Sequence, residues 1–115
     1  MKSGISTVIY PTQDLAAAKK LFGELLGVEP YLDQPYYVGF RVDGREIGLD
    51  PHGHAETGPV AYYEVSDMTE AVKTAIAAGA AELKPAADVG GGKLIATVKD
   101  TTGNVIGLVQ PARAS

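Results

Sequence analysis

The sequence has 115 residues, of which 45% are hydrophobic and 21% are charged, and its formal net charge is −4. This size suits one globular domain with a sizeable core. The basic residues are scattered and form no stripe along which a phosphate backbone could lie, which excludes nucleic acid as the expected partner. The lack of cysteine excludes disulfides, thiolate metal sites and thiol nucleophiles. No apolar run has the length of a signal-peptide core or a membrane span, so we expect a cytoplasmic protein without a membrane partner.

The first half of the chain predicts a strand, a helix and two further strands, at residues 6–10, 15–27, 36–42 and 45–50. Asp14 precedes the helical run as an N-cap, and Gly27 follows it as a left-handed stop. Asp43 and Gly44 form the turn signal of a β-hairpin between the last two strands. The elements of this half are therefore expected in the order strand, helix, hairpin.

The second half repeats this order, with elements expected at residues 60–65, 68–79, 91–98 and 104–110. Asp67 and Glu70 form a capping box at the start of the helix. Residues 100–103 (DTTG) make the turn between the last two strands. The intervening segment 51–59 (PHGHAETGP) is rich in proline and glycine, which is typical of a linker between the halves.

A short repeat supports duplication of the whole unit. Residues 44–50 read GREIGLD and residues 103–109 read GNVIGLV. Asp14 and Asp67 are a second equivalent pair, at a slightly shorter spacing, so the second copy carries extra residues between helix and hairpin, where insertions are tolerated. The sequence therefore predicts an α+β fold of two tandem βαβββ modules, at residues 1–52 and 59–112.

This arrangement resembles the vicinal oxygen chelate superfamily, which includes glyoxalase I, bleomycin-resistance proteins and extradiol dioxygenases. The resemblance is carried by VIYPTQDL (8–15), its echo YYEVSDM (62–68) and the ending DTTGNVIGLVQ (100–110). It covers nearly the whole chain and implies one domain, residues 1–115, in which two curved sheets surround a shared cavity. It also implies pairing of two chains as a homodimer.

Metal-dependent members of the superfamily place four ligands in the cavity, on the first and last strands of each module. By spacing, the corresponding residues are Thr7, Gly48, Val60 and Gly107. Metals need imidazole, carboxylate, thiolate or carbonyl donors, which valine and glycine side chains lack and a lone threonine replaces poorly. We therefore expect no metal and no cofactor. The two glycines either mark a bulge or close backbone approach, or enlarge the space for a ligand.

Two other motifs offer weaker signals. His52 and His54 could chelate a metal with Asp50, but proline and glycine interrupt the cluster on an expected loop, so solvated linker residues are the favoured interpretation. His52 could still act as an acid or base at the mouth of the cavity. The GGGK run at 90–93 lacks the following Ser or Thr and the helix of a phosphate loop, so it is read as a lead-in to a hairpin.

Side chains alternate along a strand, so Tyr62 and Glu64 share the side of Val60, whereas Glu46 and Asp50 share the side of Gly48. Several carboxylates in one concave site suit proton transfer or the binding of a cation. The candidate ligand-binding residues are Thr7, Tyr37, Phe40, Glu46, Gly48, Asp50, His52, Val60, Tyr62, Glu64 and Gly107.

These observations favour metal-independent binding of a small organic molecule, partly aromatic or cationic, in the manner of bleomycin-resistance proteins. The alternative is a metal-free isomerase or lyase with Glu64, Glu46 or His52 as general base. A third possibility is an accessory domain whose partner is another protein. The fold by itself does not choose among the three.

Overall fold

The computed structural model describes residues 4–53 and 58–112. The chain divides into two compact units, Ser6–Ala61, called the first unit, and Tyr62–Ser115 with Met1–Ile5, called the second unit. The element order is βαβββ followed by βαβββ, which confirms the expected α+β class and its duplication. The shared cavity and the assignment of the whole chain to one domain stay predictions.

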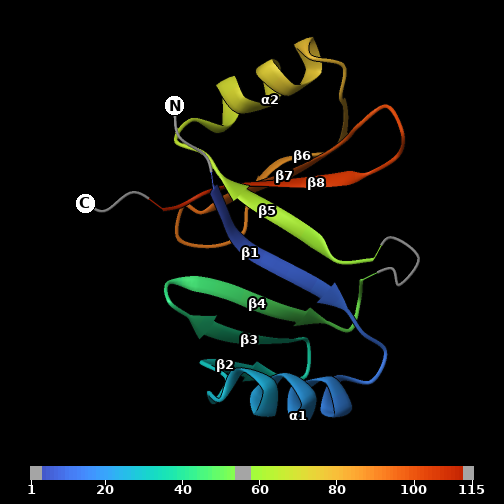
Figure 1. The fold of residues 1–115 in the computed structure, drawn as a ribbon. Helices are drawn as coiled ribbons and strands as arrows, with labels where there is room; N and C mark the ends of the chain where they lie inside the picture. The colour runs from blue at the N-terminus through green and yellow to red at the C-terminus, as the bar shows by residue number, and fades with distance from the viewer. Residues whose placement is uncertain (1–3, 54–57, 113–115) are drawn as a thin grey trace. The chain divides into compact units, whose positions relative to one another are not determined.

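The first unit contains most of β1 (Gly4–Pro11), together with α1 (Leu15–Leu26), β2 (Leu32–Gln34), β3 (Tyr37–Val42) and β4 (Arg45–Asp50). Its strands lie in the order β2-β3-β4-β1 (Figure 1). β4 pairs in parallel with β1 and antiparallel with β3, and β2 pairs antiparallel with β3. The antiparallel β3–β4 pair is a hairpin whose turn consists of Asp43 and Gly44.

In the turn of this hairpin, φ is 52° at Asp43 and 77° at Gly44. Positive φ at both central residues is the geometry of a two-residue hairpin turn, which confirms the turn expected from the sequence.

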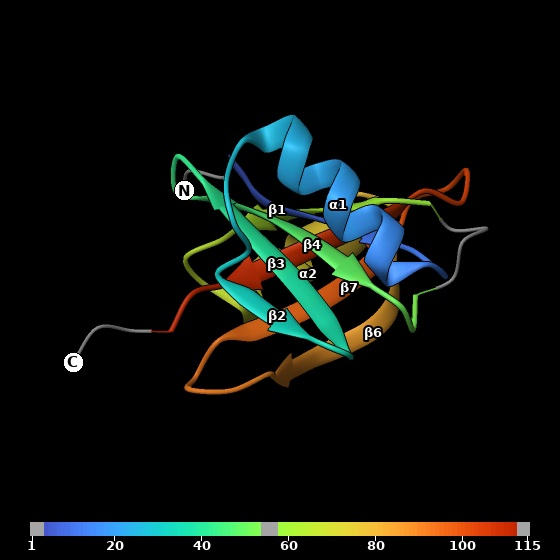
Figure 2. The same cartoon turned by 90° about the horizontal axis from the view of Figure 1, so that it is seen from below.

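Helix α1 covers one face of the sheet of the first unit (Figure 2). The Asp14 carboxylate caps its start by accepting a hydrogen bond from the Ala17 amide (3.0 Å), and Gly27 ends it with φ of 71°. The core beneath it consists of Val38, Phe40 and Leu49, packed against Leu15, Ala18, Phe22 and Leu26. On the outer side of the helix, the side chains of Leu21 and Leu25 are 61% and 71% exposed.

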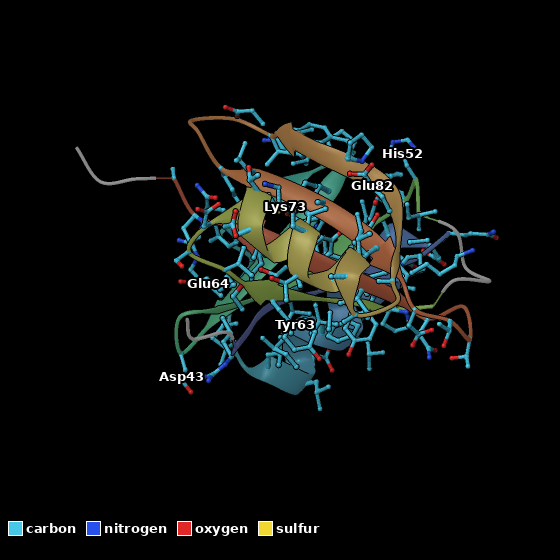
Figure 3. The ribbon with its side chains drawn as sticks, turned by 90° about the horizontal axis from the view of Figure 1, so that it is seen from above. Asp43, His52, Tyr63, Glu64, Lys73 and Glu82 are labelled. Carbon is cyan, nitrogen blue, oxygen red and sulfur yellow. The ribbon has the colours of Figure 1, made fainter. Side chains whose placement is uncertain are left out.

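The second unit contains most of β5 (Val60–Glu64), α2 (Met68–Ala77), β6 (Ala81–Asp88), β7 (Leu94–Lys99) and β8 (Val105–Gln110). Its strands lie in the order β5-β8-β7-β6, with β5 parallel to β8 and the others antiparallel. Helix α2 lies across this sheet (Figure 3). Asp67 caps the helix by accepting from the Glu70 amide, which is one of the two hydrogen bonds of the expected capping box. The core beneath it consists of Val65, Met68, Ala96 and Leu108.

The structure adds two strands to which the sequence assigned no residues, β2 and β6. It also moves the start of β7 from residue 91 to Leu94, because Gly91 and Gly92 have positive φ and belong to the preceding turn. Part of the expected linker, residues 54–57, lies outside the described residues. Within residues 4–53 and 58–112, no helix is long and apolar enough to cross a membrane.

Candidate functional site

The site begins with a pair of glycines that face each other across β3 and β4. Gly39 and Gly48 are register partners in this hairpin. Their neighbours Val38, Phe40 and Leu49 point into the core beneath α1, so alternation places both glycines on the opposite face of the sheet. This face is called the open face of the first unit.

Two tyrosine rings lie against these glycines. A Cβ atom added to Gly48 would lie 2.6 Å from Cζ of Tyr37, and one added to Gly39 would lie 2.8 Å from Cε1 of Tyr31. Neither glycine has a positive φ, so the backbone conformation does not require glycine at either position. The absence of a side chain instead lets the rings approach the backbone, which is the close-approach interpretation of a strand glycine.

Both tyrosines donate hydrogen bonds to one carboxylate, that of Glu46. Tyr31 donates to Oε1 at 2.8 Å, and Tyr37 donates to Oε2. Burial raises the pKa of both phenols, and the hydrogen bond to Glu46 raises it further. The two phenols are therefore protonated at neutral pH and act as donors. Tyr31, Tyr37 and Glu46 together are called the tyrosine clamp.

Two more charged side chains border the clamp. The Arg41 guanidinium carbon lies 4.1 Å from the centroid of the Tyr31 ring, a cation–π contact. Asp50 follows Gly48 on the same side of β4, and its negative charge contributes to the raised pKa of Tyr37. An Asp50 carboxylate oxygen also accepts a hydrogen bond from the His52 amide (2.8 Å). Thr7 pairs with Glu46 from the neighbouring strand β1.

The second unit also covers its repeated glycine with a tyrosine ring. Gly107 is covered by the ring of Tyr62, its register partner on β5, whose Cγ would lie 2.6 Å from an added Cβ. In the repeated heptapeptide, however, Val105 stands where the first copy has Glu46. The duplicated glycines therefore share a role as supports for tyrosine rings, but the heptapeptide itself carries a glutamate two residues before the glycine only in its first copy.

The four positions that correspond to metal ligands in the resemblance do not fit a divalent cation. Gly48 and Gly107 have no donor side chain, and any side chain there would collide with the tyrosine ring that covers it. Thr7 and Val60 offer one hydroxyl between them. Across residues 4–53 and 58–112, no group of three or more His, Cys, Asp or Glu side chains could hold a metal ion.

Three other candidate residues, Phe40, His52 and Glu64, do not belong to the tyrosine clamp. Phe40 was expected at the ligand site, but it is fully buried in the core beneath α1 and is corrected to a core residue, because it alternates with Gly39 along β3. His52 and Glu64 are exposed and project outward from the ribbon in Figure 3. His54 lies outside the described residues.

Sequence reasoning missed Tyr31 and Arg41. The signal that could have found them is the hairpin register, because a turn at Asp43 and Gly44 aligns Gly39 with Gly48 and Arg41 with Glu46. Two aligned glycines beside a tyrosine-rich segment indicate a place where rings could lie on the sheet. The position of Tyr31, on the connection between α1 and β2, carries no comparable signal.

No protein-family model matches the sequence, and no curated protein matches it. Solved structures do share its architecture, and the chain has the fold of the glyoxalase, bleomycin-resistance and dioxygenase superfamily. One is a member of that superfamily from Vibrio splendidus 12B01, with a TM-score of 0.70, 16% identity and coverage of 96% of this chain and 100% of that chain.

Two further structures have comparable similarity. Methylmalonyl-CoA epimerase from Mycobacterium tuberculosis has a TM-score of 0.69 at 20% identity, over 96% of this chain and 89% of that chain. The Mn(II)-bound glyoxalase from Novosphingobium aromaticivorans has a TM-score of 0.70 at 16% identity, over 96% of this chain and 41% of that chain. At these identities the similarity establishes the fold alone.

Proposed function

We propose that the open face of the first unit binds a small organic molecule without a metal ion. The observation that carries this proposal is the tyrosine clamp, a carboxylate fixed by two phenols on a face of the sheet that α1 does not cover. The hydrogen bonds from the two phenols hold the Glu46 carboxylate in place before any ligand binds. A preorganised carboxylate can orient a ligand at a low entropic cost. We expect the protein to act in the cytoplasm.

The same geometry bears on the enzymatic alternative. Tyr37 is a neutral acid and Glu46 is a carboxylate, so the pair could transfer a proton in a metal-free isomerase or lyase. One structural neighbour is an epimerase by name. However, phenol hydrogens already occupy two of the roughly four lone-pair positions of Glu46. This favours binding over proton abstraction.

The test begins with native mass spectrometry of the untagged protein from its own cells, followed by titration of any small molecule that co-purifies. We expect Glu46→Gln to weaken binding by about tenfold or more, because the charge of the clamp is lost. Glu64→Gln is the matched control, since Glu64 is an exposed carboxylate outside the clamp. Binding that is weakened by Glu64→Gln but not by Glu46→Gln would refute the proposed site.

Two further measurements separate the alternatives. Deuterium incorporation into the bound molecule in D₂O would support proton transfer by Glu46 instead of simple binding. A co-purified polypeptide in place of a small molecule would support the accessory-domain hypothesis. Elemental analysis after dialysis against a chelator should find far less than one transition metal per chain, and a retained stoichiometric metal would contradict the metal-independent proposal.

A further inference from the structure

The open face of the first unit already contains one cation held on a tyrosine ring. The guanidinium of Arg41 lies over Tyr31, and the hydroxyl of Tyr31 is bound to Glu46. Arg41 and Glu46 are also register partners across β3 and β4. The protein thus combines an aromatic ring, a carboxylate and a delocalised cation in one place.

Tyr37 repeats this arrangement without the cation. Its hydroxyl is bound to the same carboxylate, its ring lies on Gly48, and its side chain stays partly exposed. Glu46 and Asp50 stand on either side of Gly48 along the same face of β4, so two carboxylates flank this ring. Among the described residues, the cation–π contact is that of Arg41 with Tyr31, and Tyr37 has none.

Building on the proposed function, we propose that the ligand is an organic cation with delocalised or shielded charge, a guanidinium or methylated ammonium group, seated on the Tyr37 ring between Glu46 and Asp50. A guanidinium is weakly hydrated and stacks on aromatic rings, whereas a primary ammonium is strongly hydrated and needs several acceptors. Glu46 has given two acceptor positions to the phenols, and Asp50 accepts from the His52 amide. The Tyr37 ring and the negative charge of the carboxylates therefore contribute more to the binding of the cation than further hydrogen bonds do.

The experiment compares phenylguanidine with its uncharged isostere phenylurea by NMR titration of the ¹⁵N-labelled full chain. We expect phenylguanidine to shift the amide signals of β3 and β4 around Gly48 and to bind about tenfold more tightly than phenylurea. Equal binding of both probes would show that the ligand need not be a cation, while leaving the proposed function intact. Absence of any shift around Gly48 with phenylguanidine would refute the proposed position of the cation on the Tyr37 ring.

Variants of the ring test the mechanism. Tyr37→Leu removes both the aromatic face and the hydrogen bond to Glu46 and should weaken phenylguanidine about tenfold, whereas Tyr37→Phe loses only the hydrogen bond and should weaken it less. Arg41→Ala exposes the Tyr31 ring beside the same carboxylate and should create a second phenylguanidine site. Equal loss in both Tyr37 variants would contradict seating on the ring, and unchanged stoichiometry in Arg41→Ala would contradict the equivalence of the two rings.

Discussion

At the scale of single residues, the duplicated glycines act through the tyrosines that cover them. Gly48 would meet the far end of the Tyr37 side chain, around Cζ, whereas Gly107 would meet the Tyr62 ring near its base, at Cγ. A ring that is contacted at its far end can swing aside, but one contacted at Cγ has little room to move. The two positions therefore differ in their tolerance of a methyl group.

We expect Gly48→Ala to destabilise the protein by about 1 kcal/mol and Gly107→Ala by about 2 kcal/mol, as overpacked substitutions do. Gly23→Ala, in the interior of α1, is the control, because the nearest neighbours of an added Cβ, a ring carbon of Phe40 and the carbonyl oxygen of Val28, lie at 3.8 Å. Removing a helix-interior glycine there should stabilise by about 0.5–1 kcal/mol. Urea denaturation of the three variants measures these changes, and a neutral Gly107→Ala would refute the role given to Tyr62.

Thr97 is the one residue of β7 whose polar atom is buried without a partner among the described residues. Its side chain is 7% exposed, and its hydroxyl makes no hydrogen bond. It stands opposite Gly107 in the β7–β8 register. A buried hydroxyl without a partner keeps its desolvation cost.

Thr97→Val should therefore raise the free energy of unfolding by about 1 kcal/mol, because the shape is kept and the unpaired hydroxyl is removed. Thr97→Ser should lower it, because this change keeps the hydroxyl and removes a buried methyl group. Chemical denaturation of both variants measures the difference. Destabilisation by valine would show that the hydroxyl has a partner in solution.

At the scale of elements, the turn between β7 and β8 is organised by one carboxylate. Asp100 accepts hydrogen bonds from the backbone and side chain of Asn104 and from those of Thr102. These bonds, that of the Asn104 side chain above all, lower the pKa of Asp100 from 3.8 to about 2. The Asp-x-x-Gly-Asn ending therefore has a structural explanation in this chain.

This lowered pKa predicts a pH dependence. Because the folded pKa lies below the unfolded one, the stabilisation is present above the unfolded value of 3.8 and is lost as the pH falls through about 2. We expect Asp100→Asn to be less stable than the parent at pH 7, with the difference shrinking as the pH drops towards 2. Urea midpoints across this range measure it, and a difference that does not change with pH would contradict the assignment.

At the scale of the whole molecule, the exposed strands and helices differ in how well they could pair with a second copy of the chain. Strand β2 of the first unit is a poor template for pairing because it has 3 residues, and β6 of the second unit is one because it contains Pro85 and two irregularities in its register. By contrast, Leu21 and Leu25 form an exposed apolar pair one turn apart on α1. Helix α1 is therefore the more favourable surface for a second copy.

We expect a homodimer that depends on α1. Light scattering at high micromolar concentration should give the mass of two chains, and Leu25→Lys should reduce it to one. Leu83→Lys, an exposed apolar position on β6, is the matched control and should leave the dimer intact. A monomeric parent protein would contradict the prediction, and dissociation by the control alone would place the interface on β6.

Local patterns in the sequence were sufficient to predict the helix caps, one hairpin turn and the duplication of the unit. The capping residues Asp14 and Asp67, the turn at Asp43 and Gly44, and the repeated heptapeptide depend on neighbours within a few residues. Alternation along β4 was also sufficient to place Glu46 with Gly48. Such features are readable because helix caps, hairpin turns and strand alternation follow from local backbone geometry.

The chemistry of the candidate site was decided by tertiary structure. Tyr31 reaches Glu46 only because β2, β3 and β4 align, and Phe40 leaves the site because α1 covers its side of the sheet. The glycine at position 48 could mark open space or a close approach until the ring of Tyr37 was placed on it. Local sequence determines which residues can share a face, but contacts between distant segments determine which of them touch, because register and packing are set by the whole fold.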